Sequence, residues 1–295
     1  MEKREIEKKK SEQKNIVLFL LLCMIGGTTY AFQKIGVENG LPLWTAGVRF
    51  LIAGGILICC SLLKGAFKYD KDTFAVSLQY GILYFALPFG AIYWVGQFLP
   101  SGLLSVLSAS VAVFSVIFNF LFKGEKTTKN QVFGIFFSML GVIAIFIQSS
   151  LASYNHAYLL SLTIALLAYI GAAYATALLK NRVQKIQPLT FNSMSLLIGG
   201  STLCIVSFLV EDGNRLFYGK GLISLLYLAI AGSMFATRIT TYLMSQWHVA
   251  KVTMYRFAAP VISLLAGFLL FKEILHSYEM VGVVLIIVGI VFINK

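Results

Sequence analysis

The sequence predicts an all-helical integral membrane protein with ten transmembrane helices, arranged as two inverted five-helix repeats. Three observations lead to this fold class. The 295-residue chain is 58% hydrophobic and only 12% charged, whereas a soluble domain is about one quarter charged. Its apolar residues form ten runs of about the length that crosses a bilayer. The last five runs repeat the residue spacing of the first five.

Short polar segments separate the ten runs and set the expected span boundaries. About 20 apolar residues in a helix cover the hydrocarbon core of a bilayer. Glycine, serine and proline inside the runs do not oppose this prediction, because neighbouring helices satisfy the backbone groups that they free. The expected spans are 16–34, 43–63, 73–95, 100–122, 131–148, 157–179, 190–210, 220–243, 250–271 and 278–293.

The basic residues predict the orientation of the spans rather than a nucleic-acid partner. With the N-terminus inside, 17 lysines and arginines fall on the cytoplasmic side and four fall outside, which is the positive-inside pattern. Residues 1–15 are then a charged cytoplasmic tail, and both termini are cytoplasmic. The four cysteines lie within apolar runs, so no disulfide framework, metal site or cofactor is expected.

The two halves, 16–148 and 157–293, repeat one design. A shift of 148 residues superimposes Glu125, Gly134 and Gly141 on three residues of the same types, which are Glu273, Gly282 and Gly289. Because each half has an odd number of spans, the second half crosses the membrane in the opposite sense. Inverted repeats are typical of transporters with a substrate site at mid-membrane. The alternative is a duplicated bundle that transports nothing.

Polar side chains in lipid are costly, so the helix face that carries them indicates a cavity. In the fourth span they recur at steps of 4, 3, 7 and 4 residues, all on one face. Serines can also simply pack helices together, but for a whole stripe opposite an arginine we favour a cavity wall. The stripes comprise Ser101, Ser105, Ser108, Ser115 and Asn119; Thr253, Arg256, Pro260 and Ser263; and Arg238, Thr241, Tyr242 and Ser245.

Every aspartate and glutamate falls in a tail, a loop or a span end. Arg238 and Arg256 therefore lack a deep carboxylate partner, although arginine stays protonated even when buried. We expect a substrate anion to bind them through the planar guanidinium. The alternative is that they bond backbone carbonyls or snorkel. Pro260 and Pro88 free backbone carbonyls and are expected to kink their helices, and Tyr84 lies deep enough to face the cavity.

The chain resembles the drug/metabolite transporter superfamily, specifically its ten-helix EamA-like group. The resemblance covers nearly all of residues 16–293 and depends on Arg49-Phe50-Leu51-Ile52-Ala53, Glu125, Glu273, the two glycine pairs and Pro260. It implies a central cavity lined by spans 1, 3, 4, 6, 8 and 9. It also implies export of small metabolites, often amino acids. Arg49, Glu125, Glu273, Gly134 and Gly282 are then structural. Ala112 stands where the group has a proline.

These observations predict an alternating-access exporter of a small carboxylate-bearing metabolite, such as an amino acid. Spans 5 and 10, poor in polar groups, are expected to form an outer support or a homodimer contact. The runner-up is a flippase for a phosphate-bearing lipid-linked substrate. An intramembrane enzyme is disfavoured because the spans lack a histidine or acid beside a nucleophile. The expected binding residues are Arg238, Arg256, Tyr242, Tyr84, Ser105, Ser108, Thr241, Thr253 and Ser115.

Overall fold

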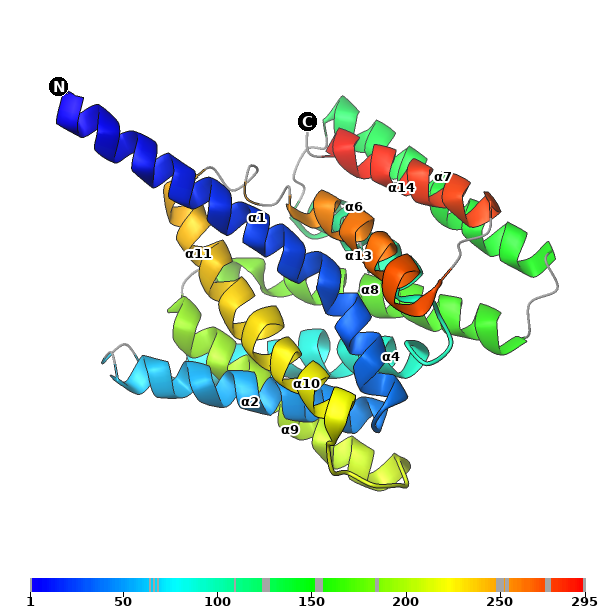
Figure 1. Cartoon of the computed structure of the whole chain (residues 1–295), viewed down its shortest axis with the longest axis horizontal. Coiled ribbons are helices and arrows are strands. Elements are labelled where there is room, and N and C mark those ends of the chain that lie inside the picture. The colour runs from blue at the N-terminus through cyan, green and yellow to red at the C-terminus, as the bar shows by residue number, and fades with distance from the viewer. Residues whose placement is uncertain are drawn as a thin grey trace.

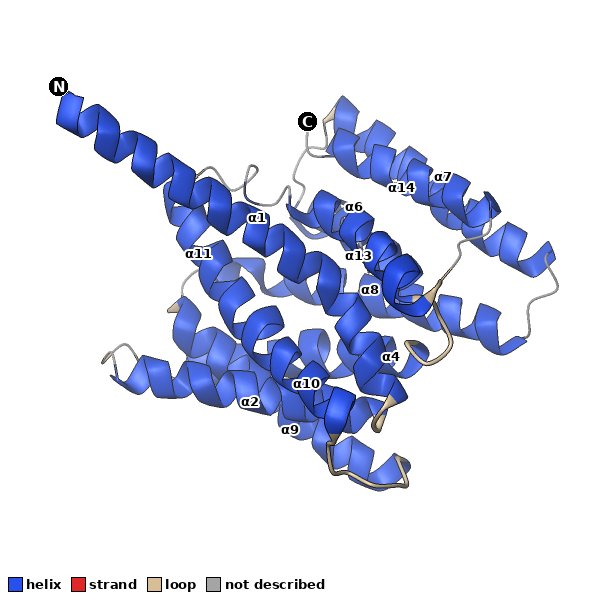
Figure 2. Cartoon of the chain, viewed as in Figure 1, coloured by secondary structure: helices blue, strands red, loops and turns tan. Residues whose placement is uncertain are grey.

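A computed structural model describes most of the chain. The residues outside it are 1, 64, 66, 68, 109, 124–127, 152–155, 184–185, 248–251, 253–254, 274–276 and 294–295. Side chains are also outside it at 2–11, 112, 123, 145–151, 180–181, 183, 241, 244–245, 256–257, 277–279, 290 and 293. Figures 1 and 2 show that the described part is built of helices, with no strand in it.

The all-helical membrane fold is confirmed. Seven helical segments are long and apolar enough to cross a membrane, and three shorter apolar helices cover 129–144, 258–271 and 280–289. Their order matches the ten expected spans. The elements of the first half are α1 (Glu2–Glu38), α2 (Pro42–Leu63), α3 (Lys71–Tyr80), η1 (Gly81–Ala86), α4 (Leu87–Val95), α5 (Ser101–Ser108), α6 (Ser110–Lys123) and α7 (Lys129–Leu151).

The second half repeats this order from α8 onward. Its elements are α8 (His156–Val183), α9 (Pro188–Val210), α10 (Gly219–Tyr227), η2 (Leu228–Phe235), α11 (Ala236–Gln246), α13 (Tyr255–Phe271) and α14 (Ser277–Ile293). The third span is thus α3, η1 and α4 in series, the fourth is α5 and α6, and the eighth is α10, η2 and α11. The charged residues that precede the first span belong to the same helix as that span, α1.

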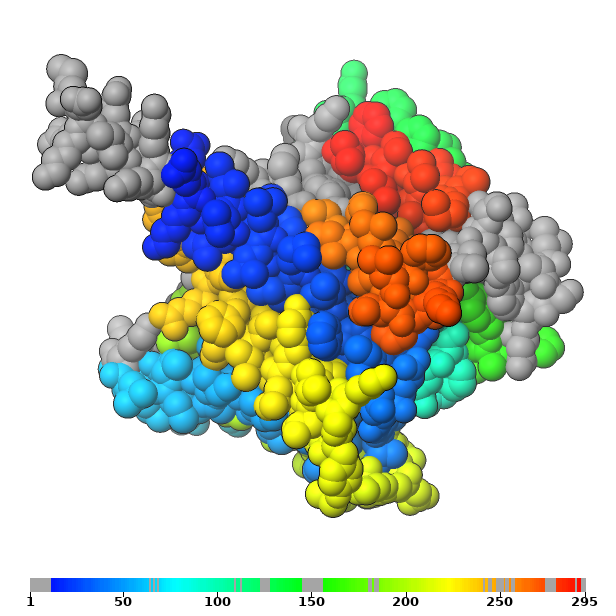
Figure 3. Space-filling model, in the orientation of Figure 1, coloured from blue at the N-terminus to red at the C-terminus, as the bar shows by residue number. Residues whose placement is uncertain are grey.

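The helix contacts pair up as an inverted repeat requires. α2 packs on α9, and α7 packs on α14, so each of these spans meets its own counterpart. The contact of α1 with α13 is matched by that of α8 with α6, and the contact of α2 with η2 by that of α9 with η1. In Figure 3, α1 (blue) lies between the eighth span, made of α10, η2 and α11 (yellow), and α13 (orange).

A stretch of wide π-helix interrupts the third span and the eighth span at matching places. In the first half, Pro88 has no N–H to donate, and the helix widens just before it, so the N–H of Leu87 reaches back to the carbonyl of Ile82. The break expected at Pro88 therefore takes the form of a wide turn. In the second half no proline lies in the eighth span, and there the Ser233 hydroxyl donates to the carbonyl of Leu228 at 3.1 Å.

The α7–α14 pair is held so close that its glycines have no room for a side chain. A Cβ at Gly289 would lie 2.5 Å from the Gly134 oxygen, and a Cβ at Gly141 would lie 2.6 Å from the Gly282 oxygen. Small residues allow such close approach of helices in membranes. The pair stands at one side of the bundle in Figure 1, and no described residue of either helix lines the central cavity.

Candidate functional site

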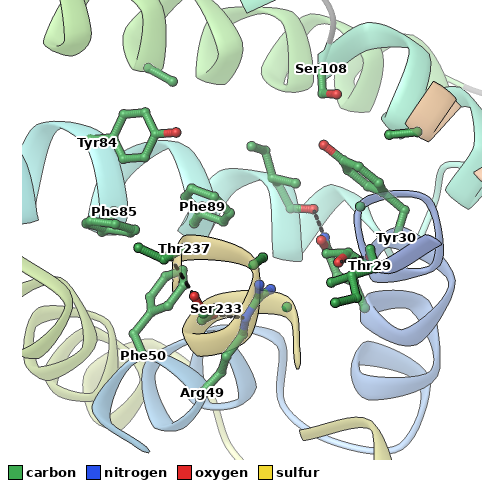
Figure 4. A pocket seen from close by; sticks show the side chains of 18 of the residues that line it. Thr29, Tyr30, Arg49, Phe50, Tyr84, Phe85, Phe89, Ser108, Ser233 and Thr237 are labelled. Carbon is green, nitrogen blue, oxygen red and sulfur yellow. Dashed lines mark hydrogen bonds between the residues drawn. The ribbon is translucent and has the colours of Figure 1, made fainter. Parts of the chain in front are cut away.

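A cavity of about 520 Å³ lies between the two halves, with walls from both. Its described lining comes from every span except the fifth and the tenth, so the second and seventh spans join the six that the resemblance implied. Figure 4 shows Arg49 and Ser233 on one side and the rings of Phe50, Phe85 and Phe89 beside them, with Tyr30 directed toward Ser108. The volume is that of a site for a small molecule.

Eight of the described lining residues are phenylalanine or tyrosine. Phe50 meets Phe85 and Phe89 edge to face, each at 5.2 Å between ring centroids. Tyr80 and Tyr84 stack at 4.6 Å. Such offset and edge contacts are favourable arrangements for aromatic pairs. The wide turn of η1 contributes Tyr84 and Phe85 to this wall, so the break in the third span shapes the cavity.

Arg49 is the one basic residue among the described lining residues, and none of those residues is acidic. Its side chain is 4% exposed. Nε donates to the Ser233 hydroxyl at 3.1 Å, and Nη1 donates to the Tyr93 hydroxyl at 2.8 Å. These partners belong to different halves, because Tyr93 is in α4 and Ser233 is in η2. Arg49 therefore bridges the halves through neutral groups.

The second nitrogen of the fork, Nη2, faces Gly232. A Cβ at Gly232 would lie 3.3 Å from Nη2, so a larger residue there would press on the guanidinium. The only ion pair in the described part of the chain lies elsewhere, between Lys34 and Glu273. A buried cation without a carboxylate is costly. This wall is therefore suited to an anionic group.

A group of hydroxyls lies across the cavity. Tyr30 is directed toward Ser108, and Tyr169 lines the same side (Figure 4). The Tyr169 hydroxyl also donates to the carbonyl of Leu104 at 2.9 Å, and the Ser108 hydroxyl donates to that of Ser105 at 2.6 Å. This side offers neutral hydrogen-bonding groups only. The cavity thus has a cationic side and a neutral polar side, with aromatic rings between them.

The structure brings together two of the expected binding residues, Tyr84 and Ser108, at the cavity wall. Ser105 is fully buried, with no partner for its hydroxyl in the described part of the chain, and neither Ser105 nor Ser115 lines the cavity. The predicted meeting of the fourth and ninth spans does occur, since the Ser263 hydroxyl donates to the carbonyl of Ser101 at 3.4 Å. Thr253 and the side chains of Thr241 and Arg256 lie outside the described residues.

Arg238 does not lie on the described wall of this cavity. Its side chain is exposed, and α11 instead presents Ala236, Thr237 and Thr240. Successive residues of a helix are turned by about 100° from each other, so the face that carries Arg238 points elsewhere. On that face the ring centroid of Tyr242 lies 5.1 Å from the ammonium nitrogen of Lys14. In the sequence, the helical spacing of the hydroxyl residues Ser233, Thr237 and Thr240 was the signal that could have identified the face on the cavity wall.

A second polar cluster lies just beyond one end of the cavity. The Lys34 ammonium pairs with Glu273 Oε1 at 2.5 Å, and the Ser101 backbone N–H donates to the same oxygen at 3.0 Å. The Ser101 hydroxyl donates to Oε2 at 2.8 Å. Burial acts to raise the pKa of Glu273, but the bonds from Lys34 and Ser101 hold that pKa below its ordinary value. Glu125, its repeat counterpart, lies outside the described residues.

Inverted repeats that enclose a central cavity between them are a transporter architecture. The comparisons agree, because the model of the EamA-like transporter family matches residues 13–147 and again 159–295. The chain belongs to the EamA-like transporter family and is a membrane transporter.

Relatives match nearly the whole chain. The Escherichia coli K12 protein called uncharacterized inner membrane transporter YedA is 30% identical over 275 residues, covering 92% of this chain and 88% of that protein. The Bacillus subtilis protein called uncharacterized transporter YvbV is 25% identical over 280 residues, covering 94% and 90%. A solved crystal structure aligns with a TM-score of 0.66 at 14% identity, covering 95% of this chain and 96% of that one. That last likeness shows the fold alone.

Proposed function

We propose that the chain exports a small carboxylate-bearing metabolite, such as an amino acid, across the cytoplasmic membrane by alternating access, with both termini inside. The observation that carries the proposal is Arg49, a buried cation at the cavity wall with neutral partners only. A carboxylate that accepts from Nη2 would supply the missing charge. A hydrogen bond to a charged group contributes about 1.5–3 kcal/mol.

The rest of the wall suits the remainder of such a substrate. Tyr84, Phe85 and Phe89 would contact an apolar or aromatic body, and Tyr30 and Ser108 would bond its polar atoms. A strongly cationic substrate is disfavoured, because the described wall offers no acid to balance it.

Arg256, Thr241 and Thr253 stay in the proposal on the basis of the sequence. Arg238 and Tyr242 would join the site only in a state in which α11 turns its exposed face inward. The two arginines, Arg49 and Arg238, are therefore competing candidates for the anion.

The test begins with cells that contain or lack the chain, whose growth media are compared by metabolite profiling. We expect an acid to be enriched in the medium of cells that contain the chain. That acid and its neutral amide are then supplied to inverted membrane vesicles. Uptake of the acid at least about tenfold better than its amide is expected, from the loss of one charge-assisted bond. Equal uptake of the two compounds, or enrichment of cations alone, would overturn the proposal.

A further inference from the structure

One end of the cavity is sealed by an apolar layer. Along α1 the cavity wall runs from Leu22 to Gln33 and stops there. Gln33 itself is 2% exposed, and its side-chain amide donates to the carbonyl of Ile92 in α4. Beyond it lie Val95, Leu99 and Leu103, each at most 1% exposed, in one packed cluster. The cavity is thus separated from this end of the molecule.

Outside that layer, Glu273 ties three elements together. It accepts from Lys34 on α1 and from Ser101 at the amino end of α5. Glu273 itself lies in the connection from α13 to α14. α1 and α5 belong to the first half and Glu273 to the second, so this contact joins the two halves. The carboxylate also caps α5, where backbone N–H groups otherwise lack partners.

α13 packs closely against Glu273 and Ser101. A Cβ at Gly267 of α13 would lie 3.1 Å from the Ser101 hydroxyl and still closer to the Glu273 carboxylate. The Ser263 hydroxyl, one turn earlier in α13, donates to the carbonyl of Ser101. Because α13 carries Tyr255 and Ala259 on the cavity wall, any movement of α13 away from α5 changes the wall as well.

We infer that Lys34, Glu273 and the amino end of α5 form a latch that keeps this end of the cavity closed, and that the latch must break for this end to open. Two halves that rock about a central site must separate at one end while they meet at the other. The latch is the ion-paired contact between the halves at the sealed end. The inference rests on the alternating-access part of the proposed function, but its test needs no substrate.

The experiment measures access to the cavity from each face of the membrane. Cys23, Cys59, Cys60 and Cys204 are replaced by alanine, and Thr29→Cys introduces one reporter at the cavity wall. A membrane-impermeant thiol reagent is applied to right-side-out vesicles and to inverted vesicles of the full chain. In this background the reporter is expected to react slowly from the face at the sealed end.

Glu273→Gln removes the ion pair and weakens the cap of α5. Loss of a bond to a charged group shifts the closed-to-open equilibrium about tenfold or more, so labelling from the sealed face is expected to rise by that factor. Lys34→Met leaves the cap intact and is expected to give a smaller rise. It also replaces the first variant if Glu273→Gln does not fold.

The matched control is Glu211→Gln. Glu211 also caps a helix and joins the two halves, since the backbone N–H groups of Leu43 and Trp44 donate to it, but its carboxylate forms no ion pair within the described part of the chain. It is expected to leave labelling from both faces unchanged. Unchanged labelling in both latch variants would overturn the latch, as would an equal rise in the control. If metabolite profiling finds no exported acid, the thiol-labelling measurement is unaffected. That result would count against the proposed substrate alone.

Discussion

Exchanging Arg49 for lysine separates the cavity arginine from the exposed one. Two of the three guanidinium nitrogens of Arg49 are occupied, Nε by Ser233 at 3.1 Å and Nη1 by Tyr93 at 2.8 Å. In the described part of the chain no protein group accepts from Nη2, so this nitrogen is available to a substrate. The lysine ammonium has three donors, but it is a point charge and cannot reproduce the planar fork that spans Ser233, Tyr93 and a carboxylate.

The magnitude follows from the loss of one bond to a charged group, about 1.5–3 kcal/mol. Because about 1.4 kcal/mol corresponds to a factor of ten, Arg49→Lys is expected to raise the half-saturating concentration of the carboxylate roughly 10- to 140-fold. Arg238→Lys is the matched control. Its side chain is exposed and off the described wall, so we expect a change within about twofold, as for a surface position.

The assay is uptake into inverted vesicles of the acid found by profiling and of its neutral amide. A lost anion contact raises the half-saturating concentration of the acid alone, whereas a loosened bundle lowers the maximal rate for both compounds. A larger effect of Arg238→Lys than of Arg49→Lys would contradict the assignment of the anion to Arg49. So would equal effects of Arg49→Lys on the acid and on the amide.

Three further predictions concern stability and positioning. Gly289→Ala is expected to cost about 1–3 kcal/mol in thermal unfolding in detergent, because its Cβ would lie 2.5 Å from a backbone oxygen of α7; Gly55→Ala, with nothing within 4 Å, should cost nothing. The pKa of Glu273 is lowered by folding, so its contribution to stability is full near neutral pH and is lost as the pH falls below 4.5; a Glu273→Gln chain should lose less stability across that window, and equal losses would contradict the assignment. Tyr93→Phe removes a bond to Arg49 from outside the wall, so it should weaken uptake of the acid more than of the amide; equal effects on both would contradict a positioning role.

The spans could be predicted from the sequence because each is a long apolar run. The few polar groups of the fifth and tenth spans predicted an outer support or a homodimer contact, and the structure packs these two helices, α7 and α14, on each other. The two π-helices could not be fully predicted. Pro88 marks the first, since it removes a donor. The second lies at 228–235 without any proline, and the bond from the Ser233 hydroxyl to the carbonyl of Leu228 within it has no distinct pattern in the sequence.

The candidate site was predicted in part, and the reason is geometric. Tyr84 and Ser108 line the cavity, as their depth and stripe indicated. In α11, the pattern of polar side chains favoured the face that holds Arg238, but the cavity wall is made by the neighbouring face with Thr237 and Thr240. Arg49 was expected to be structural. Its bonds to Tyr93 and Ser233 are long-range, so spacing within one helix could not reveal that it meets the cavity.

The wide turn η2 has a consequence for charge inside the bundle. A π-helix bonds one residue further back than an α-helix does, so it accommodates about one extra residue in its length. A regular helix through the same residues would turn α11 by about 100°. Arg238 would then take the place of Ile239, which is 7% exposed and packs against Leu22 and Ile25 of α1. The π-helix therefore keeps the guanidinium of Arg238 out of the apolar contact between α1 and α11 and leaves it exposed.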